Sequence, residues 1–305
     1  MKLAEFDAWM NTEAERVERA LEAWVPVDAP AGLGLAMRYG VLDGGKRVRP
    51  LLVLAASQAV HGLPQAALRA ACAVELIHAY SLVHDDMPCM DNDVLRRGKP
   101  TVHVRFGQAQ AMLAGDAMQA LAFEVLTPSI GERLSDPDAQ AVPPALQARL
   151  CALLARAAGH AGMAGGQAID LASIGLPLGE QALRDMHHRK TGALLRSSVL
   201  MGAACGTVSP VQWSALADYG DALGLAFQVV DDILDVTQAS ATLGKTAGKD
   251  LDNNKPTYVT VLGLDAARRH ASELRDKALA ALARSGLPDA AWLSLLADKV
   301  VERDS

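Results

Sequence analysis

Four carboxylates fall close together in one short segment of the chain, between an apolar stretch and a basic one. They belong to Asp85, Asp86, Asp91 and Asp93. Carboxylates at this density repel one another, and cations among them relieve the repulsion. Oxygen ligands of this kind suit Mg²⁺, which proteins typically hold with one or two carboxylates, waters and substrate phosphates. The segment therefore predicts a magnesium site that works together with a phosphate-bearing ligand.

Basic residues follow the acidic segment at once, and their side chains are suited to bind phosphate directly. They are Arg96, Arg97 and Lys99. Far downstream lies a second acidic cluster, which consists of Asp231, Asp232 and Asp235. Since each acidic cluster comes at the end of an apolar helical stretch, we expect one metal site built from two sides.

A second basic segment, residues 44–50, combines two glycines with three cationic side chains. Its sequence is Gly44-Gly45-Lys46-Arg47-Val48-Arg49-Pro50. The glycines interrupt the preceding helical pattern, and Pro50 fits the first turn of a new helix over 51–60. Basic side chains beside the N–H groups of a helix start are suited to bind phosphate. The segment is therefore either a phosphate seat or a solvated basic turn.

The helix predicted over 66–86 must position the first acidic cluster. Its surface is mostly apolar, but polar residues recur on one face at gaps of three and four. They are Glu75, His78, Ser81 and Asp85. Buried polar side chains need partners, and a polar stripe that runs into an acidic cluster favours a functional site. Pro88 ends the helix, and this break lets Asp85 and Asp91 share a cation.

The helix predicted over 213–235 carries a matching stripe before the second acidic cluster. Gln228, Asp231 and Asp235 follow one another at gaps of three and four, away from the apolar face. A helix is also predicted over 180–205, where Lys190-Thr191-Gly192 indicates a local break because glycine weakens a helix. We expect such a break to expose backbone carbonyl groups.

The remaining pattern is helical as well. Amphipathic helices are predicted over 3–24, 108–126 and 145–172, with a kink or close helix packing at the glycines of the last. Residues 257–303 predict two or three closing helices, and the polar, proline-containing stretch 128–144 predicts a surface loop. A composition rich in Ala and Leu and poor in aromatic residues favours helix over sheet. We therefore expect an all-α protein with a single domain over 1–305.

Composition excludes several classes of function. The formal charge of −6 over 305 residues argues against a nucleic-acid partner. The four cysteines are widely spaced without a zinc-binding pattern, which predicts a reduced, cytoplasmic chain. The early acidic residues argue against a signal peptide. The longest uncharged stretches, 50–68 and 197–217, are interrupted by polar residues, glycine or proline, so we expect buried core helices and no stable membrane insertion.

Three familiar motifs are incomplete. The segment Gly244-Lys245-Thr246 resembles the end of a P-loop, but Ala239 stands where the first glycine is required. The segment from Asp91 resembles the start of a calcium loop, but Arg96 occupies its sixth position instead of glycine. The pair Gly32 and Gly34 lacks the third glycine of a dinucleotide fingerprint. Kinase, calcium-sensor and Rossmann interpretations are thereby disfavoured.

Taken together, these motifs resemble those of the trans-isoprenyl diphosphate synthases, and most closely those of the bacterial short-chain farnesyl diphosphate synthases. The resemblance covers nearly the whole chain. It rests on four segments in a characteristic order: 44–50, 85–97, 190–192 and 227–235. It implies an all-α bundle around a deep central cavity, and a homodimer. It also implies head-to-tail condensation of isopentenyl diphosphate with dimethylallyl and geranyl diphosphates, with three Mg²⁺ ions and Mn²⁺ as a substitute.

The resemblance also implies roles for individual residues. The metal set would be Asp85, Asp91, Asp231 and Asp235, the last directly or through bound water, with Asp86 and Asp232 in support. Isopentenyl diphosphate would be held by Lys46, Arg49, His78 and Arg97. The allylic diphosphate would be held by Arg96, Lys190 and Lys245, with help from Lys255. Thr191 and Gln228 would lie against the developing carbocation. The catalytic set would be Asp85, Asp86, Asp91, Arg96, Lys190, Asp231 and Lys245.

Two residues before the first acidic cluster are expected to set product length. In the family, chain growth is stopped by residues one helical turn before this cluster. Helical spacing puts Ser81 directly beneath Asp85, with Tyr80 beside it. A tyrosine there would close the cavity early, which predicts the fifteen-carbon product (E,E)-farnesyl diphosphate. Geranyl and geranylgeranyl diphosphates are the alternatives.

Four remote alternatives follow from the same residues, and the first, a purely structural acidic bundle, is disfavoured because it would show no paired polar stripes on two helices. A class I terpene cyclase uses acidic metal motifs in a helical bundle, but it needs no second diphosphate seat, so Lys46, Arg49 and Arg97 argue against it. A head-to-head prenyl coupling enzyme is disfavoured for similar reasons. A non-catalytic partner subunit of a heteromeric synthase would be expected to lose carboxylates, whereas both acidic clusters are intact here.

Overall fold

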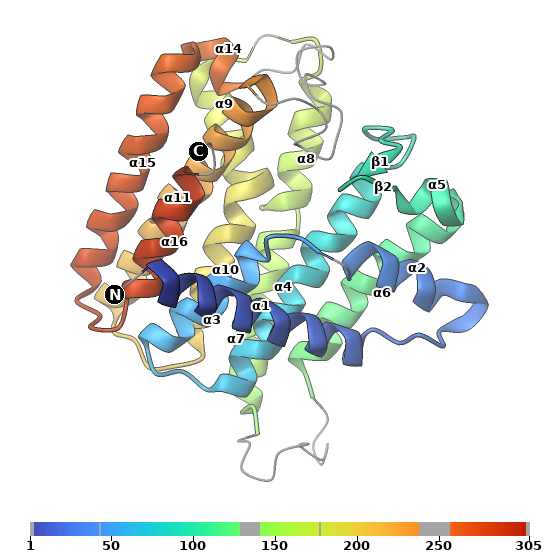
Figure 1. The fold of residues 1–305 in the computed structure, drawn as a ribbon, viewed down its shortest axis with the longest axis horizontal. Coiled ribbons are helices and arrows are strands. Elements are labelled where there is room, and N and C mark those ends of the chain that lie inside the picture. Colours follow the sequence, from blue (N-terminus) through green and yellow to red (C-terminus); the bar gives the residue numbers. More distant parts are fainter. Residues whose placement is uncertain (1–2, 43, 129–140, 177, 238–256, 303–305) are drawn as a thin grey trace.

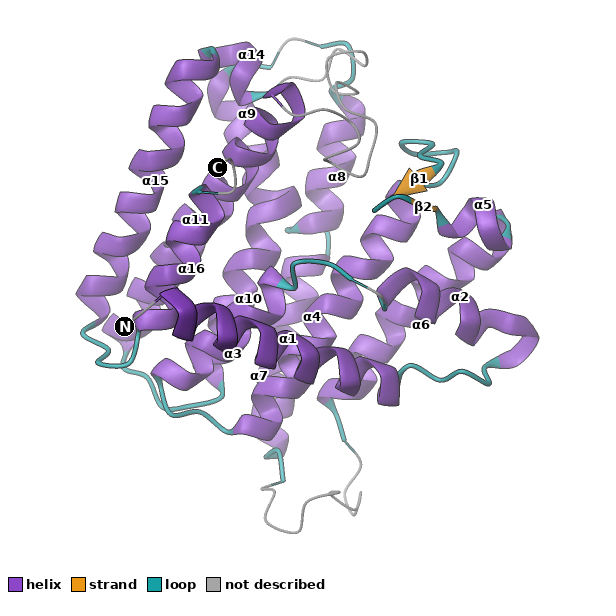
Figure 2. Cartoon of the chain, in the orientation of Figure 1, coloured by secondary structure: helices purple, strands orange, loops and turns teal. Residues whose placement is uncertain are grey.

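The computed structural model describes residues 3–42, 44–128, 141–176, 178–237 and 257–302, and these residues are almost entirely helical (Figure 2). The prediction of an all-α fold is confirmed. The helices are α1 (Leu3–Trp24), α2 (Leu33–Val41), α3 (Val48–Ala59), α4 (Pro64–Asp85), α5 (Val102–Phe106), α6 (Gln108–Leu126), α7 (Pro144–Ala158), α8 (Met163–Ala172), α9 (Glu180–His187), α10 (Ala193–Ala204), α11 (Pro210–Thr237), α14 (Tyr258–Leu262), α15 (Leu264–Ser285) and α16 (Ala291–Val301). Short elements are the 3₁₀ turn η1 (Pro30–Gly32), the π-helical turn η2 (His188–Gly192), and the strands β1 (Leu95–Arg96) and β2 (Lys99–Pro100).

Two helices join the buried apolar side chains into a continuous interior. The helix α10 gives Leu194 and Met201 to a cluster built around α4 and α6, and gives Leu195 to a second cluster with α3 and α16. The helix α11 gives Leu223 to this second cluster and Val230 to a third, which α9, α14 and α15 complete. A helix that is apolar on several faces is buried within a bundle, which explains why α10 and α11 lie inside.

The helices that carry the two acidic clusters run toward the same end of the molecule. In the view of Figure 1, α4 and α11 both end toward the top, where the β1–β2 hairpin, α8 and α9 also lie. Within the described part of the chain, α4 is the one helix long and apolar enough to span a membrane by length and composition, with a mean hydropathy of 1.4. Of that window, 72% is buried inside the bundle, as in a core helix.

The predicted helices over 3–24 and 108–126 match α1 and α6 residue for residue. The single helix predicted over 145–172 was wrong in one respect, because the chain forms two helices, α7 and α8, separated by 159–162. At Gly162 an added Cβ would lie 2.1 Å from the carbonyl oxygen of Ala157, so only glycine permits this tight turn. The break predicted at Lys190 is a wide π-helical turn, which keeps the chain helical through η2 into α10.

Close packing of α10 on α3 depends on Gly202. A Cβ added there would lie 2.2 Å from the carbonyl oxygen of Val53, in a backbone that has no flexible side chain to yield. Gly179, which precedes α9, has open space at the same position and an ordinary negative φ of −70°.

We expect Gly202→Ala to lower the free energy of unfolding by about 1–3 kcal/mol, because the added methyl group overpacks the α3–α10 contact. The matched variant Gly179→Ala should change it by less than about 0.5 kcal/mol, as is usual for an unhindered surface substitution. Urea unfolding of both variants measures the difference. Equal stabilities would contradict the argument from packing.

Candidate active site

The first acidic cluster occupies a folded loop at the end of α4. The N–H of Asp91 donates to the carbonyl oxygen of Asp85 at 2.9 Å, and the N–H of Asp93 donates to the carbonyl oxygen of Asp86 at 3.0 Å. These bonds fold the chain back beyond Pro88, so residues that a straight helix would separate become neighbours. The arrangement agrees with the expectation that the break brings Asp85 and Asp91 together.

Electrostatics at Asp85 show how concentrated the negative charge is. Burial raises the pKa of Asp85 to about 6. Lys190 and Arg96 oppose this rise, whereas Asp91 and Asp86 reinforce it. A carboxyl group whose pKa is raised by burial and by other carboxylates is one whose charge a bound cation would stabilise. The donor set at this loop therefore fits Mg²⁺.

Asp86 is paired with Arg96. The Nε atom of Arg96 donates to both carboxylate oxygens at 2.9 Å, and its Nη2 donates to Oδ1 at 2.6 Å. Asp86 is 2% exposed and the Arg96 side chain is partly exposed, so this is a partly buried ion pair with several charge-assisted hydrogen bonds. The pair holds Arg96 beside the acidic loop. Metal support by Asp86 and phosphate binding by Arg96 stay predictions.

The hairpin formed by β1 and β2 carries Arg97 back toward the other basic segment. Arg97 and Gly98 both have positive φ, at 53° and 73°, which is the pattern of a two-residue type I′ turn. The Nη1 atom of Arg97 donates to the carbonyl oxygen of Gly44 at 2.6 Å. A Cβ on Gly45 would lie 2.8 Å from Nη2 of Arg97, so glycine there permits the approach.

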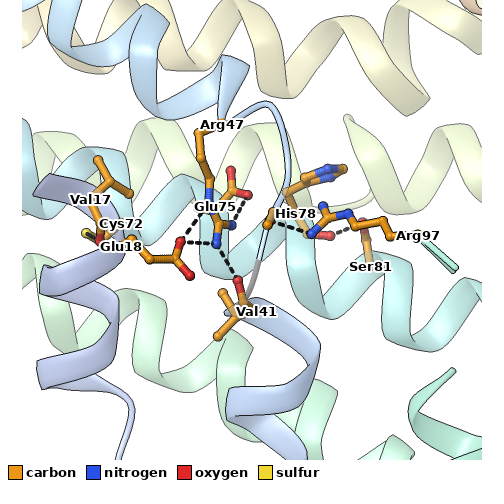
Figure 3. Close-up of polar contacts among 10 residues, drawn as sticks. Val17, Glu18, Val41, Arg47, Cys72, Glu75, His78, Ser81 and Arg97 are labelled. Carbon is orange, nitrogen blue, oxygen red and sulfur yellow. Dashed lines mark hydrogen bonds and ion pairs between the residues drawn. The ribbon is translucent and has the colours of Figure 1, made fainter. Parts of the chain in front are cut away.

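Arg47 anchors the basic segment from within. It is 4% exposed, and its Nη1 donates to Oε1 of Glu75 at 2.6 Å. It also bonds Glu18 of α1 and the carbonyl oxygen of Val41, as Figure 3 shows. The predicted phosphate ligands on either side of it are Lys46, which is exposed, and Arg49, which lies in the first turn of α3. Sequence reasoning assigned no role to the Arg47–Glu75 pair.

His78 lies on α4 among arginines from several segments. Figure 3 shows it beside Ser81 and Arg97. Burial lowers the pKa of His78 well below its ordinary value, and Arg49, Arg97, Arg96 and Arg47, in that order, lower it further. His78 is therefore neutral at pH 7 and can donate or accept a hydrogen bond. The concentration of guanidinium groups makes this side of α4 suited to a polyanion.

Lys190 faces the acidic loop from the opposite side. Its Nζ atom bonds Oδ2 of Asp170 on α8 at 2.6 Å, and Asp170 is 5% exposed. Gly166 permits close packing of α8 on η2, since a Cβ there would lie 2.2 Å from the backbone nitrogen of Lys190. The influence of Lys190 on the pKa of Asp85 places its charge near the predicted metal ligands. The partner Asp170 had no predicted role, although its place on one face of a helix was visible in the sequence.

The second acidic cluster is ordered by hydrogen bonds along α11. The hydroxyl group of Thr191 donates to Oε1 of Gln228 at 2.9 Å, and Nε2 of Gln228 donates to Oδ1 of Asp232 at 2.8 Å. Asp232 and Asp235 are 3% and 6% exposed, whereas Asp231 is partly exposed. The structure therefore joins Thr191 to Gln228 by a hydrogen bond and makes Asp231 the most accessible carboxylate of this cluster, while the place of Thr191 and Gln228 beside the carbocation stays a prediction.

The predicted metal set does not form a closed cage. Among the described residues, no group of three His, Cys, Asp or Glu side chains comes together as a metal site. Binding of Mg²⁺ by these carboxylates, together with waters and substrate phosphates, stays a prediction. The predicted phosphate ligands Lys245 and Lys255 lie outside the described residues.

The residues expected to limit product length lie on different sides of α4. The hydroxyl group of Ser81 donates to the carbonyl oxygen of His78 at 2.8 Å within the helix. The ring of Tyr80 is partly buried and meets the ring of His84 edge-on, with 5.7 Å between centroids. Burial and then Asp85 raise the pKa of Tyr80. The expected central cavity and the role of Tyr80 as its floor stay predictions.

His187, at the end of α9, is a buried histidine that sequence reasoning missed. It is 6% exposed and stacks on the ring of Tyr258, with 5.6 Å between centroids. Neither ring nitrogen has a hydrogen-bond partner among the described residues. Burial lowers the pKa of His187 to about 4, opposed by Asp170 and reinforced by Lys190. The imidazole is therefore neutral beside Lys190.

We expect His187 to make the protein less stable in acid. The unfolded chain binds a proton at this residue near pH 6.5 and the folded protein only near pH 4, so stability is lost as pH falls through this interval. From pH 7 to 4.5 the wild-type protein should lose about 2–3 kcal/mol more than His187→Gln. Urea unfolding of both proteins at the two pH values measures this difference, and parallel losses would refute it.

Comparisons with known proteins agree with this geometry. The sequence profile described as "Polyprenyl synthetase" matches residues 31–285. The chloroplastic geranylgeranyl pyrophosphate synthase of Catharanthus roseus is 45% identical over 306 residues, which cover 99% of this chain and 82% of that protein.

Solved structures are similar over nearly the whole chain. A putative farnesyl-diphosphate synthase from Marinomonas sp. MED121 is 39% identical, with a TM-score of 0.80, and the match covers 99% of this chain and 100% of that one. The geranyltransferase of Helicobacter pylori, complexed with magnesium and isoprenyl diphosphate, is 33% identical, with a TM-score of 0.82 and coverage of 97% and 96%. Sequence, fold and site geometry thus agree that this chain belongs to the polyprenyl synthetase family, the prenyltransferases that make isoprenyl diphosphates.

Proposed function

We propose that this protein condenses isopentenyl diphosphate head-to-tail with allylic diphosphates in a Mg²⁺-dependent reaction. One observation carries the proposal: one face of α4 carries a cationic region around His78 and, two turns further along the helix, an anionic region around Asp85. Two diphosphates that bind differently need such a division. The cationic region is suited to bind a diphosphate directly, and the anionic region is suited to bind one through metal ions.

The seat for isopentenyl diphosphate would lie between α3, α4 and the hairpin. Lys46, Arg49, His78 and Arg97 would hold its phosphates. The bond from Arg97 to Gly44 draws the two basic segments together before any substrate binds. Because Arg97 is oriented in advance, little of its side-chain freedom would be lost when the diphosphate binds.

The seat for the allylic diphosphate would lie beside the acidic loop. Arg96 and Lys190 would contact its phosphates, and Lys245 and Lys255 are proposed to join them. Mg²⁺, when bound by Asp85, Asp91, Asp231 and Asp235, would neutralise the diphosphate and make it a better leaving group. Asp86 and Asp170 would hold Arg96 and Lys190 in place, since each forms an ion pair with its cation.

The reaction would begin when the carbon–oxygen bond of the allylic diphosphate breaks, with both electrons leaving on the diphosphate. Thr191 and Gln228 would stabilise the resulting allylic cation with their oxygen dipoles. The double bond of isopentenyl diphosphate would then attack the cation and form the new carbon–carbon bond. The proton lost in the last step would pass to the released diphosphate, so no side chain need act as base.

We infer geranylgeranyl diphosphate as the first candidate product and farnesyl diphosphate as the second. The relative from Catharanthus roseus, 45% identical, is a twenty-carbon synthase by name, which favours the longer product. Tyr80 favours the shorter one, because a large ring one turn before Asp85 shortens the space beneath it. We further propose a cytoplasmic homodimer with a single catalytic domain in each chain.

The reaction is tested with purified protein, dimethylallyl diphosphate and excess isopentenyl diphosphate. We expect Mg²⁺-dependent prenyl products that are abolished by EDTA and restored by added Mg²⁺.

The variant Arg97→Gln tests the seat for isopentenyl diphosphate. It should raise the KM for isopentenyl diphosphate about 10- to 100-fold, because one charged hydrogen bond to the substrate is lost. The KM for the allylic substrate should change little. The control Arg105→Gln alters an arginine on α5 that lies over Tyr39 and should leave both constants unchanged. Products without Mg²⁺, or equal effects on both substrates, would contradict the two-seat proposal.

Product length is measured by mass spectrometry after the phosphates are removed. Geranylgeraniol as the main alcohol would support the first candidate, and Tyr80→Ala should then leave its length unchanged. Farnesol as the main alcohol would support the second candidate, and Tyr80→Ala should then shift the product to twenty carbons or more. The matched variant Tyr39→Ala, on α2, should not lengthen the product.

A further inference from the structure

The side-chain amide of Gln228 is held at both ends. Its Nε2 atom donates to Oδ1 of Asp232 at 2.8 Å, and its Oε1 atom accepts from the hydroxyl group of Thr191 at 2.9 Å. The other oxygen of Asp232, Oδ2, accepts from the backbone N–H of Tyr258 at 2.7 Å. The four residues therefore form one hydrogen-bonded chain from η2 through α11 to α14.

Asp232 decides which way this amide points. An ionised carboxylate can only accept hydrogen bonds, whereas the hydroxyl group of Thr191 can donate or accept. The amide nitrogen of Gln228 must therefore face Asp232, since the reverse orientation would set two acceptors against each other. Asp232 is 3% exposed, so water cannot readily relieve such a mismatch, and unmatched buried polar groups are costly.

We propose that Asp232 is a positioning residue, which orients the Gln228 amide so that two oxygen dipoles point toward the allylic carbocation. This inference rests on the proposed function. Thr191 gives its one hydroxyl proton to Gln228, so the lone pairs of its oxygen are left for the reacting carbon. Dipoles fixed in advance stabilise a developing charge without reorganisation.

The far end of the hydrogen-bonded chain is firmly fixed. Tyr258 is the first residue of α14, where a backbone N–H has no partner within its own helix, and Asp232 supplies one. Thr257 and Thr260 cap this helix reciprocally. The ring of Tyr258 packs between His187 and His270, at 5.6 and 5.7 Å between centroids. The N–H that orients Asp232 is therefore held by the packing of several helices.

The substitution Asp232→Asn tests the proposal because its outcome is fixed by hydrogen-bonding rules. The backbone N–H of Tyr258 can only donate, so the oxygen of the new side chain must face it. Its NH₂ group then faces Gln228, whose amide must turn over to accept. The amide nitrogen, with its partial positive charge, would then lie where the oxygen had faced the carbocation.

We expect Asp232→Asn to lower kcat about 10- to 100-fold, comparable to the loss of one preorganised dipole. The KM values for both diphosphates and the Mg²⁺ concentration for half-maximal rate should stay within about twofold. Asp218→Asn is the matched control. Asp218 is an exposed carboxylate of the same helix that pairs with Arg284, and its replacement should leave kcat unchanged.

The double variant Asp232→Asn with Gln228→Glu distinguishes the loss of the correct side-chain orientation at position 228 from a general disruption of the site. A carboxylate at 228 can accept from both Thr191 and the NH₂ group at 232, so an oxygen faces the carbocation again. We expect kcat to recover at least about tenfold over the single variant. The single variant Gln228→Glu should be poorer than the double, because it sets two carboxylates together.

The outcomes distinguish this inference from the proposed function. An inactive wild-type protein would refute the proposed function itself. An active wild type with unimpaired Asp232→Asn, or with a raised Mg²⁺ requirement and a normal kcat at saturation, would overturn the positioning role. Circular dichroism checks folding of each variant. If Asp232→Asn alone does not fold, the double variant should still fold and be active, and its failure would also overturn the inference.

Discussion

The buried guanidinium of Arg47 is the interaction on which the cationic region of this protein depends. It bonds Glu75 of α4, Glu18 of α1 and the end of α2 through Val41, so it holds three helices at the segment that precedes α3. A buried charge pair is costly to break because the remaining charge has no solvent. The flanking residues Lys46 and Arg49 are therefore presented on a rigid support.

A second constraint is the mutual repulsion of the acidic side chains. The cationic side chains of the protein itself reduce this repulsion, since Arg96 pairs with Asp86 and Lys190 lies near Asp85. Burial, reinforced by Asp91 and Asp86, raises the pKa of Asp85 despite these cations, and this is why we propose the loop as the site of divalent ions. Arg96 and Lys190 are also the cations that we propose to bind the allylic diphosphate, so the ion pairs of the free protein would hold them in place for that substrate.

The sequence predicted the helices well because each buries one face, and the spacing of apolar residues records that face. The ends of α1 and α6 follow from such patterns and from proline and glycine nearby. The hairpin at Leu95–Pro100 was missed because two-residue strands leave no alternating pattern. The division of 145–172 into α7 and α8 was missed because glycines in a helical pattern fit both a kink and a break. Product length cannot be settled from Tyr80 alone, because the space beneath a residue is set by several helices at once.

By itself, the sequence determined the helical class, the two acidic clusters and the basic segments, because covalent order and helical period fix which residues share a face. Only the tertiary structure decided which charges meet. The pairing of Arg47 with Glu75, of Lys190 with Asp170 and of Asp232 with the N–H of Tyr258 joins residues far apart in the chain. Local pattern does not encode such pairs, since they arise when the packing of apolar faces brings separate helices together and burial then demands that each polar group find a partner.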